Sequence, residues 1–248
     1  MIKEEHVMPQ SLNDLLNSGL KLGVSLLKKL SIFFYVMVLV YFFLLHFVSS
    51  LFMEGSQLST VFMSFASISF SLAATAYLMY FMMVTDEHSK KDQRKLVRRA
   101  FNKLIPSLII GGTLIFVLST LGSMLFILPG IILFIYFLFF PQVMALEEKK
   151  QVFKALKRSV RIVRGSFFVV AGVYCLFLAV QAITAIMIAF LIESSSFYVT
   201  AFISSFVHIS LIPFQAAVLN LLYLERRSER EAFDYEVFTY EAKQRLKA

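Results

Sequence analysis

The sequence predicts an all-α integral membrane protein with six transmembrane helices and basic amphipathic interfacial helices on the cytoplasmic side. Of its 248 residues, 58% are hydrophobic and 16% are charged, whereas soluble domains have about 45–50% and about 25%. Residues 104–146 contain no charged residue. All 24 lysines and arginines fall in four segments: residues 1–29, 86–103, 147–165 and 225–248. The positive-inside rule makes these segments cytoplasmic, so both termini lie on one side and the number of spans is even.

The N-terminal segment, residues 11–29, is predicted to be an interfacial amphipathic helix. Ser11 and Asp14 form a helix-start signal, and leucines recur after them at helical spacing. Two glycines interrupt this leucine stripe: Gly19 and Gly23. The uncharged run that follows, about residues 30–53, is much longer than the apolar part of a signal peptide. We therefore expect it to remain in the protein as the first span.

The next three spans follow from the uncharged runs. The second span is predicted at about residues 61–85, after a short polar turn. The long uncharged run must then fold back, because as one helix it would be about 65 Å long, roughly twice the hydrocarbon thickness of a bilayer. Its predicted break is Leu128-Pro129-Gly130, since proline cannot donate inside a helix and glycine tolerates a tight turn. The third and fourth spans are then residues 104–128 and 131–146.

The C-terminal part of the chain supplies the last two predicted spans. The fifth is expected at residues 166–192, and the uncharged run after it is too short for two spans and too long for one upright helix. We expect residues 194–204 to lie at the outer interface and the sixth span to cover about residues 205–224, bent at Pro213. Residues 225–248 form a predicted cytoplasmic tail, so the whole chain is one membrane domain.

A basic amphipathic segment precedes an apolar hairpin three times along the chain. These segments are residues 11–29, 90–103 and 150–165. One interpretation is an internal repeat of three units. The alternative is that any membrane hairpin protein needs charged cytoplasmic connectors.

The third basic segment has the clearest division into two faces. At 100° per residue, an apolar quadrant contains Phe153, Leu156, Val160 and Val163. The cations lie on the opposite side: Lys150, Lys154, Lys157, Arg158, Arg161 and Arg164. Such a face predicts contact with anionic phospholipid or with an acidic protein partner. Topological anchoring alone is the simpler interpretation. The net charge of +8 lies beside predicted spans, which favours phospholipid headgroups over nucleic acid.

The predicted spans contain few groups that could do chemistry. They hold no Asp, Glu, Lys or Arg, which argues against a proton-coupled transporter. The intramembrane polar candidates are His46, Gln181, His208, Gln215 and Asn220. The two histidines could form a site that titrates near neutral pH, or all five could hydrogen-bond between helices.

No cofactor or metal site is expected. The adjacent residues Asp86, Glu87 and His88 cannot converge on one ion. The only cysteine, Cys175, lies in an apolar run and is expected to serve packing.

Several short motifs resemble one bacterial membrane family. They are the LPG run at 128–130, the P-x-x-x-x-L-E pattern ending at Glu147, the A-L-x-R-S motif at 155–159, the V-R-G ending at 163–165 and the tail that begins LLYLERR at 221. Together they are similar to the six-span family that includes the glycerophosphoryl diester phosphodiesterase membrane domain and the stand-alone YciC-type inner-membrane proteins. The resemblance implies a bacterial inner-membrane location.

The resemblance does not bring an enzymatic activity with it. In two-part members a catalytic barrel follows the membrane domain, and such a barrel needs about 250 residues, far more than residues 225–248 supply. We therefore expect a non-enzymatic membrane protein that organises lipid, a protein partner or a second copy of itself through its basic helices. The alternative is a permease or lipid translocase whose path passes near Gln181, His208 and Gln215.

Overall fold

The computed structural model describes most of the chain as a bundle of α-helices. The described residues are 7, 11–29, 36, 40, 57–84, 90–147, 151–191, 197–231 and 233–247. Every regular element among them is an α-helix: α1 (Leu12–Lys29), α3 (Gln57–Met83), α4 (Lys90–Leu125), α5 (Ile127–Phe137), α6 (Phe140–Leu146), α7 (Val152–Val163), α8 (Phe167–Leu191), α9 (Phe197–Arg230) and α10 (Tyr235–Lys247). The expected first span, residues 30–53, lies outside the described residues apart from Val36 and Val40.

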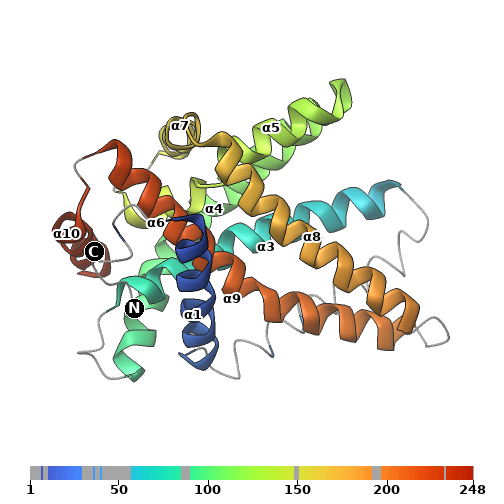
Figure 1. Cartoon of the computed structure of the whole chain (residues 1–248), viewed down its shortest axis with the longest axis horizontal. Coiled ribbons are helices and arrows are strands. Elements are labelled where there is room, and N and C mark those ends of the chain that lie inside the picture. The colour runs from blue at the N-terminus through green and yellow to red at the C-terminus, as the bar shows by residue number, and fades with distance from the viewer. Residues whose placement is uncertain are drawn as a thin grey trace.

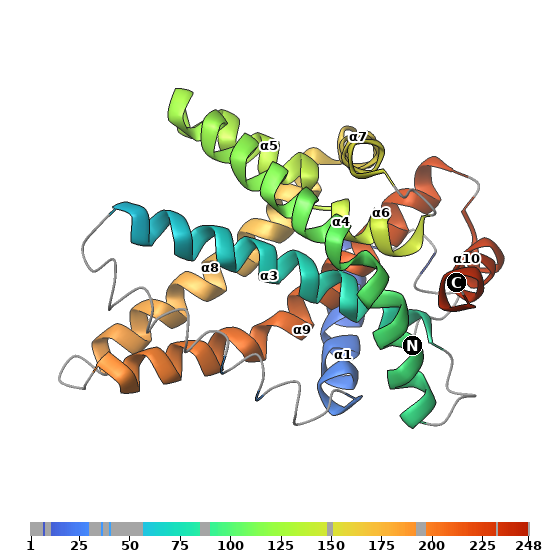
Figure 2. The same cartoon turned by 180° about the vertical axis from the view of Figure 1, so that it is seen from behind.

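The long helices converge at one end of the molecule. Helices α3, α4, α5, α8 and α9 spread apart toward one side, whereas α6, α7, α10 and the first turns of α4 gather at the other (Figures 1 and 2). We call this second side the charged end, since most of the basic residues of α4, α7 and α10 lie there. Helix α1 runs across α9 rather than along it (Figure 1).

The apolar helices leave much of their surface uncovered by protein. Three described stretches are long and apolar enough to cross a membrane, namely residues 92–124, 128–146 and 167–188, and residues 68–83 form a shorter apolar stretch. Large apolar side chains on the outside of the bundle are exposed, including Ile110 at 54% and Ile183 at 58%. Contiguous apolar surface of this kind needs a nonpolar environment. The helices thus indicate a membrane protein.

Helix α1 begins with the predicted cap and packs through its glycines. The Ser11 hydroxyl accepts a hydrogen bond from the Asp14 backbone N–H at 3.2 Å and donates to the Asp14 carboxylate at 2.6 Å. This confirms the helix-start signal. A methyl group added at Gly19 would lie 3.1 Å from the Val218 Cα of α9. The glycines therefore allow the backbones of α1 and α9 to approach closely.

The break between the third and fourth predicted spans lies earlier than Leu128-Pro129-Gly130. Helix α4 ends at Leu125, and Phe126 is extended with φ −157° and ψ 145°. Proline is accepted here in the first turn of α5, where its missing N–H would have no helical partner. Gly130 is helical and buried against α4. Its role is close helix packing and not the predicted turn.

The predicted fourth span, residues 131–146, is divided into two helices. Helix α5 ends at Phe137, and α6 begins at Phe140 with Pro141 in its first turn. A proline ring clashes with the carbonyl four residues earlier, so α5 cannot continue through this position. Gln142 is fully buried and turns its amide nitrogen toward the carbonyl oxygens of Leu138 and Phe139, at 3.3 and 3.2 Å.

Two helices are longer than predicted. Residues 90–103 do not form a separate interfacial helix but are continuous with the span that follows, in α4. In the same way, α9 joins the predicted interfacial residues from 197 onward, the sixth span and the first residues of the tail into one helix of 34 residues that contains Pro213. A change from basic to apolar residues alters which solvent the surface of the helix prefers. It does not by itself interrupt the backbone hydrogen bonds, so the helix continues. Figure 1 shows α9 changing direction along its course.

Candidate functional site

A cluster of buried ionic groups joins three helices at the charged end. Arg158 of α7 places its Nε 3.0 Å from both carboxylate oxygens of Glu147, which caps the C-terminus of α6. Tyr223 of α9 donates its hydroxyl to the same carboxylate at 3.0 Å. The side chains of Glu147 and Arg158 are only 7% and 11% exposed. The three groups therefore satisfy one another away from solvent.

The same cluster continues into the C-terminal helix. Arg158 also pairs with Glu231, which accepts from Arg227 at 3.2 Å. Arg227 in turn donates both terminal nitrogens to the carboxylate of Glu241 in α10, each at 2.7 Å. Such a two-point contact fixes the orientation of both groups. The C-terminal helix α10, which lies in the predicted tail, is thus folded back onto the bundle.

The electrostatics keep the two arginines of the cluster charged. Burial lowers the pKa of Arg158, but its hydrogen bond to Glu231 and the charge of Glu147 raise it by more, so the pKa lies above its usual value. Burial also lowers the pKa of Arg227, but its hydrogen bond to Glu241 and the nearby charges of Glu241 and Glu147 together with Tyr223 raise the pKa by more. A raised arginine pKa in the folded state contributes stability, and this contribution is lost only when the pH rises through that pKa. Both guanidinium groups therefore stay charged at all physiological pH values.

Helix α7 presents four of the six predicted cations to the outside. Lys154, Lys157, Arg161 and Arg164 are exposed, and their side chains form no ion pair within the described part of the chain. Arg158 is held in the ionic cluster, and Lys150 lies outside the described residues. The free cationic stripe therefore has four members, which we call the α7 stripe.

The buried face of α7 is rotated from the predicted one. Phe153 is 72% exposed, whereas the sequence placed it in the apolar quadrant. Ala155 and Ser159 are fully buried instead, and the Ser159 hydroxyl donates to the Tyr136 carbonyl of α5 at 2.8 Å. Small residues allow α7 to sit close to α5 and α6. Phe153 then lies at the edge of the α7 stripe.

The intramembrane polar candidates divide into separate groups. Gln181 of α8 donates its amide to Gln215 of α9 at 3.2 Å. Asn220 lies further along α9, where its amide contacts the Thr75 carbonyl at 3.5 Å. His46 and the side chain of His208 lie outside the described residues. The structure therefore brings together two of the five candidates, the glutamines, which the sequence did not predict as a pair, and it does not test the suggested pair of histidines.

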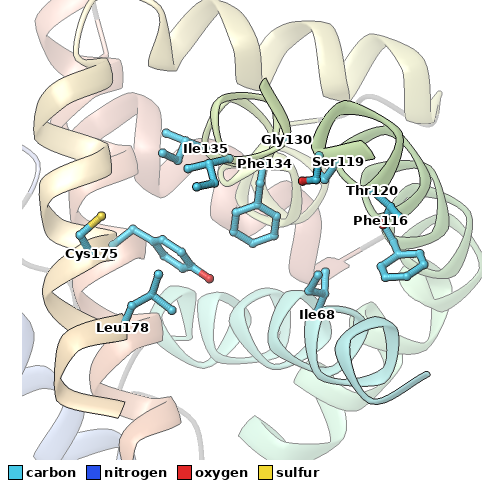
Figure 3. A pocket seen from close by; sticks show the side chains of 12 residues that line it. Ile68, Phe116, Ser119, Thr120, Gly130, Phe134, Ile135, Cys175 and Leu178 are labelled. Carbon is cyan, nitrogen blue, oxygen red and sulfur yellow. The ribbon is translucent and has the colours of Figure 1, made fainter. Parts of the chain in front are cut away.

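Two adjoining cavities lie between the membrane helices. The larger has a volume of about 500 Å³ and lies between α3, α4, α5 and α8; Figure 3 shows Phe134 and Leu178 on its walls. The smaller has a volume of about 390 Å³, is lined by Gln181 and Gln215, and shares four wall residues with the first, Phe134 and Leu178 among them. Both volumes fall in the range of small-molecule sites, about 300–1,000 Å³.

Cys175 and the acidic residues show no metal-binding arrangement where the structure is described. Cys175, which was expected to serve packing, is exposed on α8 and lies on the wall of the larger cavity (Figure 3). Within the described ranges, no group of three His, Cys, Asp or Glu side chains could hold a metal ion. The sequence 86–88 lies outside those ranges.

The ionic cluster was not predicted from sequence. Its members Glu147, Arg158 and Tyr223 all belong to the motifs that carry the family resemblance, but Tyr223 lies 76 positions from Glu147. The only sequence signal was that Glu147 and Tyr223 each lie at or near the end of an apolar run. Comparisons with protein-family models, with curated proteins and with solved structures found no match to this chain.

Proposed function

We propose that this chain is a non-enzymatic, six-span protein of the bacterial inner membrane that holds anionic phospholipid against the α7 stripe. Both termini are cytoplasmic in this proposal. The observation that supports it is the set of four exposed cations, unpaired within the described ranges, beside the exposed ring of Phe153. A basic helix with an aromatic side chain at its edge is suited to the boundary between headgroups and acyl chains.

The division of charge on α7 favours a lipid role over simple anchoring. Arg158 pairs with Glu147 and Glu231. This one cation therefore connects α7 to the ionic cluster. The four cations of the α7 stripe form no ion pair with any residue that the structure describes. Each basic residue near an anionic membrane surface contributes about 1 kcal/mol, and together they give α7 a preference for acidic headgroups.

Neutralising the α7 stripe is expected to release bound anionic lipid. The variant carries Lys154, Lys157, Arg161 and Arg164 all replaced by Gln. Native mass spectrometry of the purified chain should show phosphatidylglycerol retention reduced at least about tenfold, since losing even two contacts removes about 2 kcal/mol. The protein should still insert, because the ionic cluster is intact.

A matched variant tests whether position matters or only total charge. It replaces the exposed Lys95, Arg98, Arg99 and Lys103 of α4 by Gln, which removes the same four charges. We expect this variant to retain phosphatidylglycerol. Equal loss from both variants would contradict a specific role for α7. If the α7 variant lost a bound protein partner while its lipid content stayed unchanged, the ligand of the α7 stripe would be an acidic protein and not lipid.

A second candidate function is movement of lipid or another solute between the spans. The smaller cavity supports it, because its polar wall contains Gln181, Gln215, Ser71 and Thr75 within otherwise apolar helices. Polar groups at such depth are typical of translocation paths. A permease or lipid translocase would use this polar wall to lower the barrier for a polar headgroup.

Blocking the smaller cavity is expected to stop this movement. Proteoliposomes containing the protein should exchange a fluorescent phospholipid between leaflets, and Gln181→Phe should slow the exchange by at least about tenfold, equivalent to about 1.4 kcal/mol in the barrier. Ile183→Phe, at a lipid-exposed position of the same helix, should leave the rate unchanged. Absence of exchange by the unmodified protein would exclude a lipid translocase.

A further inference from the structure

The two cavities differ in what lines them. The larger is formed mainly by apolar side chains, among them Ile68, Phe116, Phe134 and Leu178 (Figure 3). The smaller adds the two glutamine amides at its end toward α9. Among the residues that the structure describes, no Asp, Glu, Lys or Arg lines either cavity. The combined space therefore has an apolar part and a polar, uncharged part.

The glutamine pair has hydrogen-bonding capacity left over. Gln215 is only 8% exposed, and a single hydrogen bond joins it to Gln181. Across the described residues, no other hydrogen bond engages the Gln215 amide nitrogen or the Gln181 amide oxygen. One donor and one acceptor thus line the cavity between apolar helices, where an unpaired polar group is unfavourable. A ligand that bonds to both would remove that cost.

The shape and the charge of the space restrict the ligand. A volume of about 500 Å³ is close to that of one lipid acyl chain and is too small for two. An ionised headgroup would be buried here without an opposite charge, which is strongly unfavourable. The cavity is open rather than sealed, since its wall residues Ile131 and Leu178 are 48% and 44% exposed. A ligand can therefore enter sideways from the bilayer.

We propose that these cavities bind an uncharged, single-chain amphiphile such as a monoacylglycerol or a fatty alcohol. Its chain lies along Phe134 and Leu178. A hydroxyl or ester oxygen accepts from the Gln215 amide nitrogen, and a hydroxyl donates to the Gln181 amide oxygen. This site is separate from the α7 stripe and does not rest on the lipid role proposed for that helix.

Photolabelling of the full-length protein tests this site. The protein is placed in phosphatidylcholine nanodiscs with monooleoylglycerol that carries a diazirine on its chain. Labelled residues should map to the cavity walls on α4, α5 and α8. Excess unlabelled monooleoylglycerol should compete, whereas oleate at a pH where it is ionised should not. A diazirine phosphatidylcholine reports ordinary contact with bilayer lipid.

Three variants test whether labelling depends on the cavity wall and on the glutamine pair. Leu178→Trp fills the wall shared by both cavities and should weaken binding about a hundredfold. Labelling should then fall about tenfold when the probe is at about ten times its dissociation constant for the unmodified site. Leu176→Trp, at a similarly exposed position of α8 that lines neither cavity, should have no effect. Gln215→Leu should reduce labelling by the monoacylglycerol probe but not by a diazirine alkane without a headgroup.

Defined outcomes would overturn the proposal. Equal labelling of the walls by the phosphatidylcholine probe, unchanged in Leu178→Trp, would show that bilayer acyl chains occupy the space. The hydroxyl of Ser119 is a second unpartnered group, on the wall of the larger cavity. If Ser119→Ala reduced labelling and Gln215→Leu did not, the headgroup placement would be wrong. The α7 variants should not change labelling, so failure of this site and of the α7 proposal can be distinguished.

Discussion

Replacing Arg158 by Met is expected to lower the free energy of unfolding by about 3–5 kcal/mol, the range seen when one partner of a buried ion pair is removed. The substitution leaves the Glu147 carboxylate, whose side chain is 7% exposed, without its guanidinium partner. It also removes one of the two arginine partners of Glu231, which keeps its contact with Arg227. Titration of the purified protein with a denaturing detergent, followed by circular dichroism, measures the change.

Two further variants separate this effect from loss of packing. In the double variant Glu147→Gln with Arg158→Met, the uncompensated charge is gone, so most of the stability should return. Arg161→Met alters an exposed cation one turn away and should change stability by less than about 0.5 kcal/mol. If Arg158→Met and Arg161→Met had equal effects, the ionic cluster would not be a stabilising feature of the charged end.

Much of the helical plan could be predicted because it depends on local composition. The fifth predicted span, residues 166–192, corresponds closely to α8, and the Ser11–Asp14 cap forms as expected. These features follow from uncharged length and from a contact between near neighbours in sequence. The extents of α4 and α9 could not be predicted in the same way. A charged segment and an apolar segment can share one helix, because helical hydrogen bonds are indifferent to where the solvent changes.

The α7 stripe, the ionic cluster and the cavities were predictable only in part, because local sequence does not show which distant residues come into contact. Periodicity identified α7 as basic and amphipathic, but 100° spacing cannot tell which cation turns toward a buried carboxylate. Arg158 turns inward because Glu147, eleven positions earlier at the C-terminus of α6, lies within hydrogen-bond distance of α7. The cavities depend on how five helices diverge. Neither the pairing of Gln181 with Gln215 nor the exposure of Phe153 has a counterpart in local sequence.

Gly130→Ala is expected to destabilise the protein by about 3 kcal/mol, at the upper end of the usual cost of overpacking. The added methyl group would lie 2.5 Å from the Ser119 carbonyl oxygen and 2.7 Å from the Ser123 backbone nitrogen of α4. Backbone atoms cannot rotate away as a side chain can. Helices α4 and α5 would therefore have to separate, and the wall of the larger cavity that they form would move with them.

Gly172→Ala on α8 is the matched control and should act in the opposite direction. Gly172 is exposed in mid-helix, and an added methyl group meets no atom within 4 Å. Alanine is favoured over glycine in a helix interior by about 0.5–1 kcal/mol, so this variant should be slightly more stable. The same chemical change then has opposite signs at two helical glycines. Equal effects at both positions would mean that the α4–α5 contact does not require Gly130, and that the hairpin can open at this position without loss of stability.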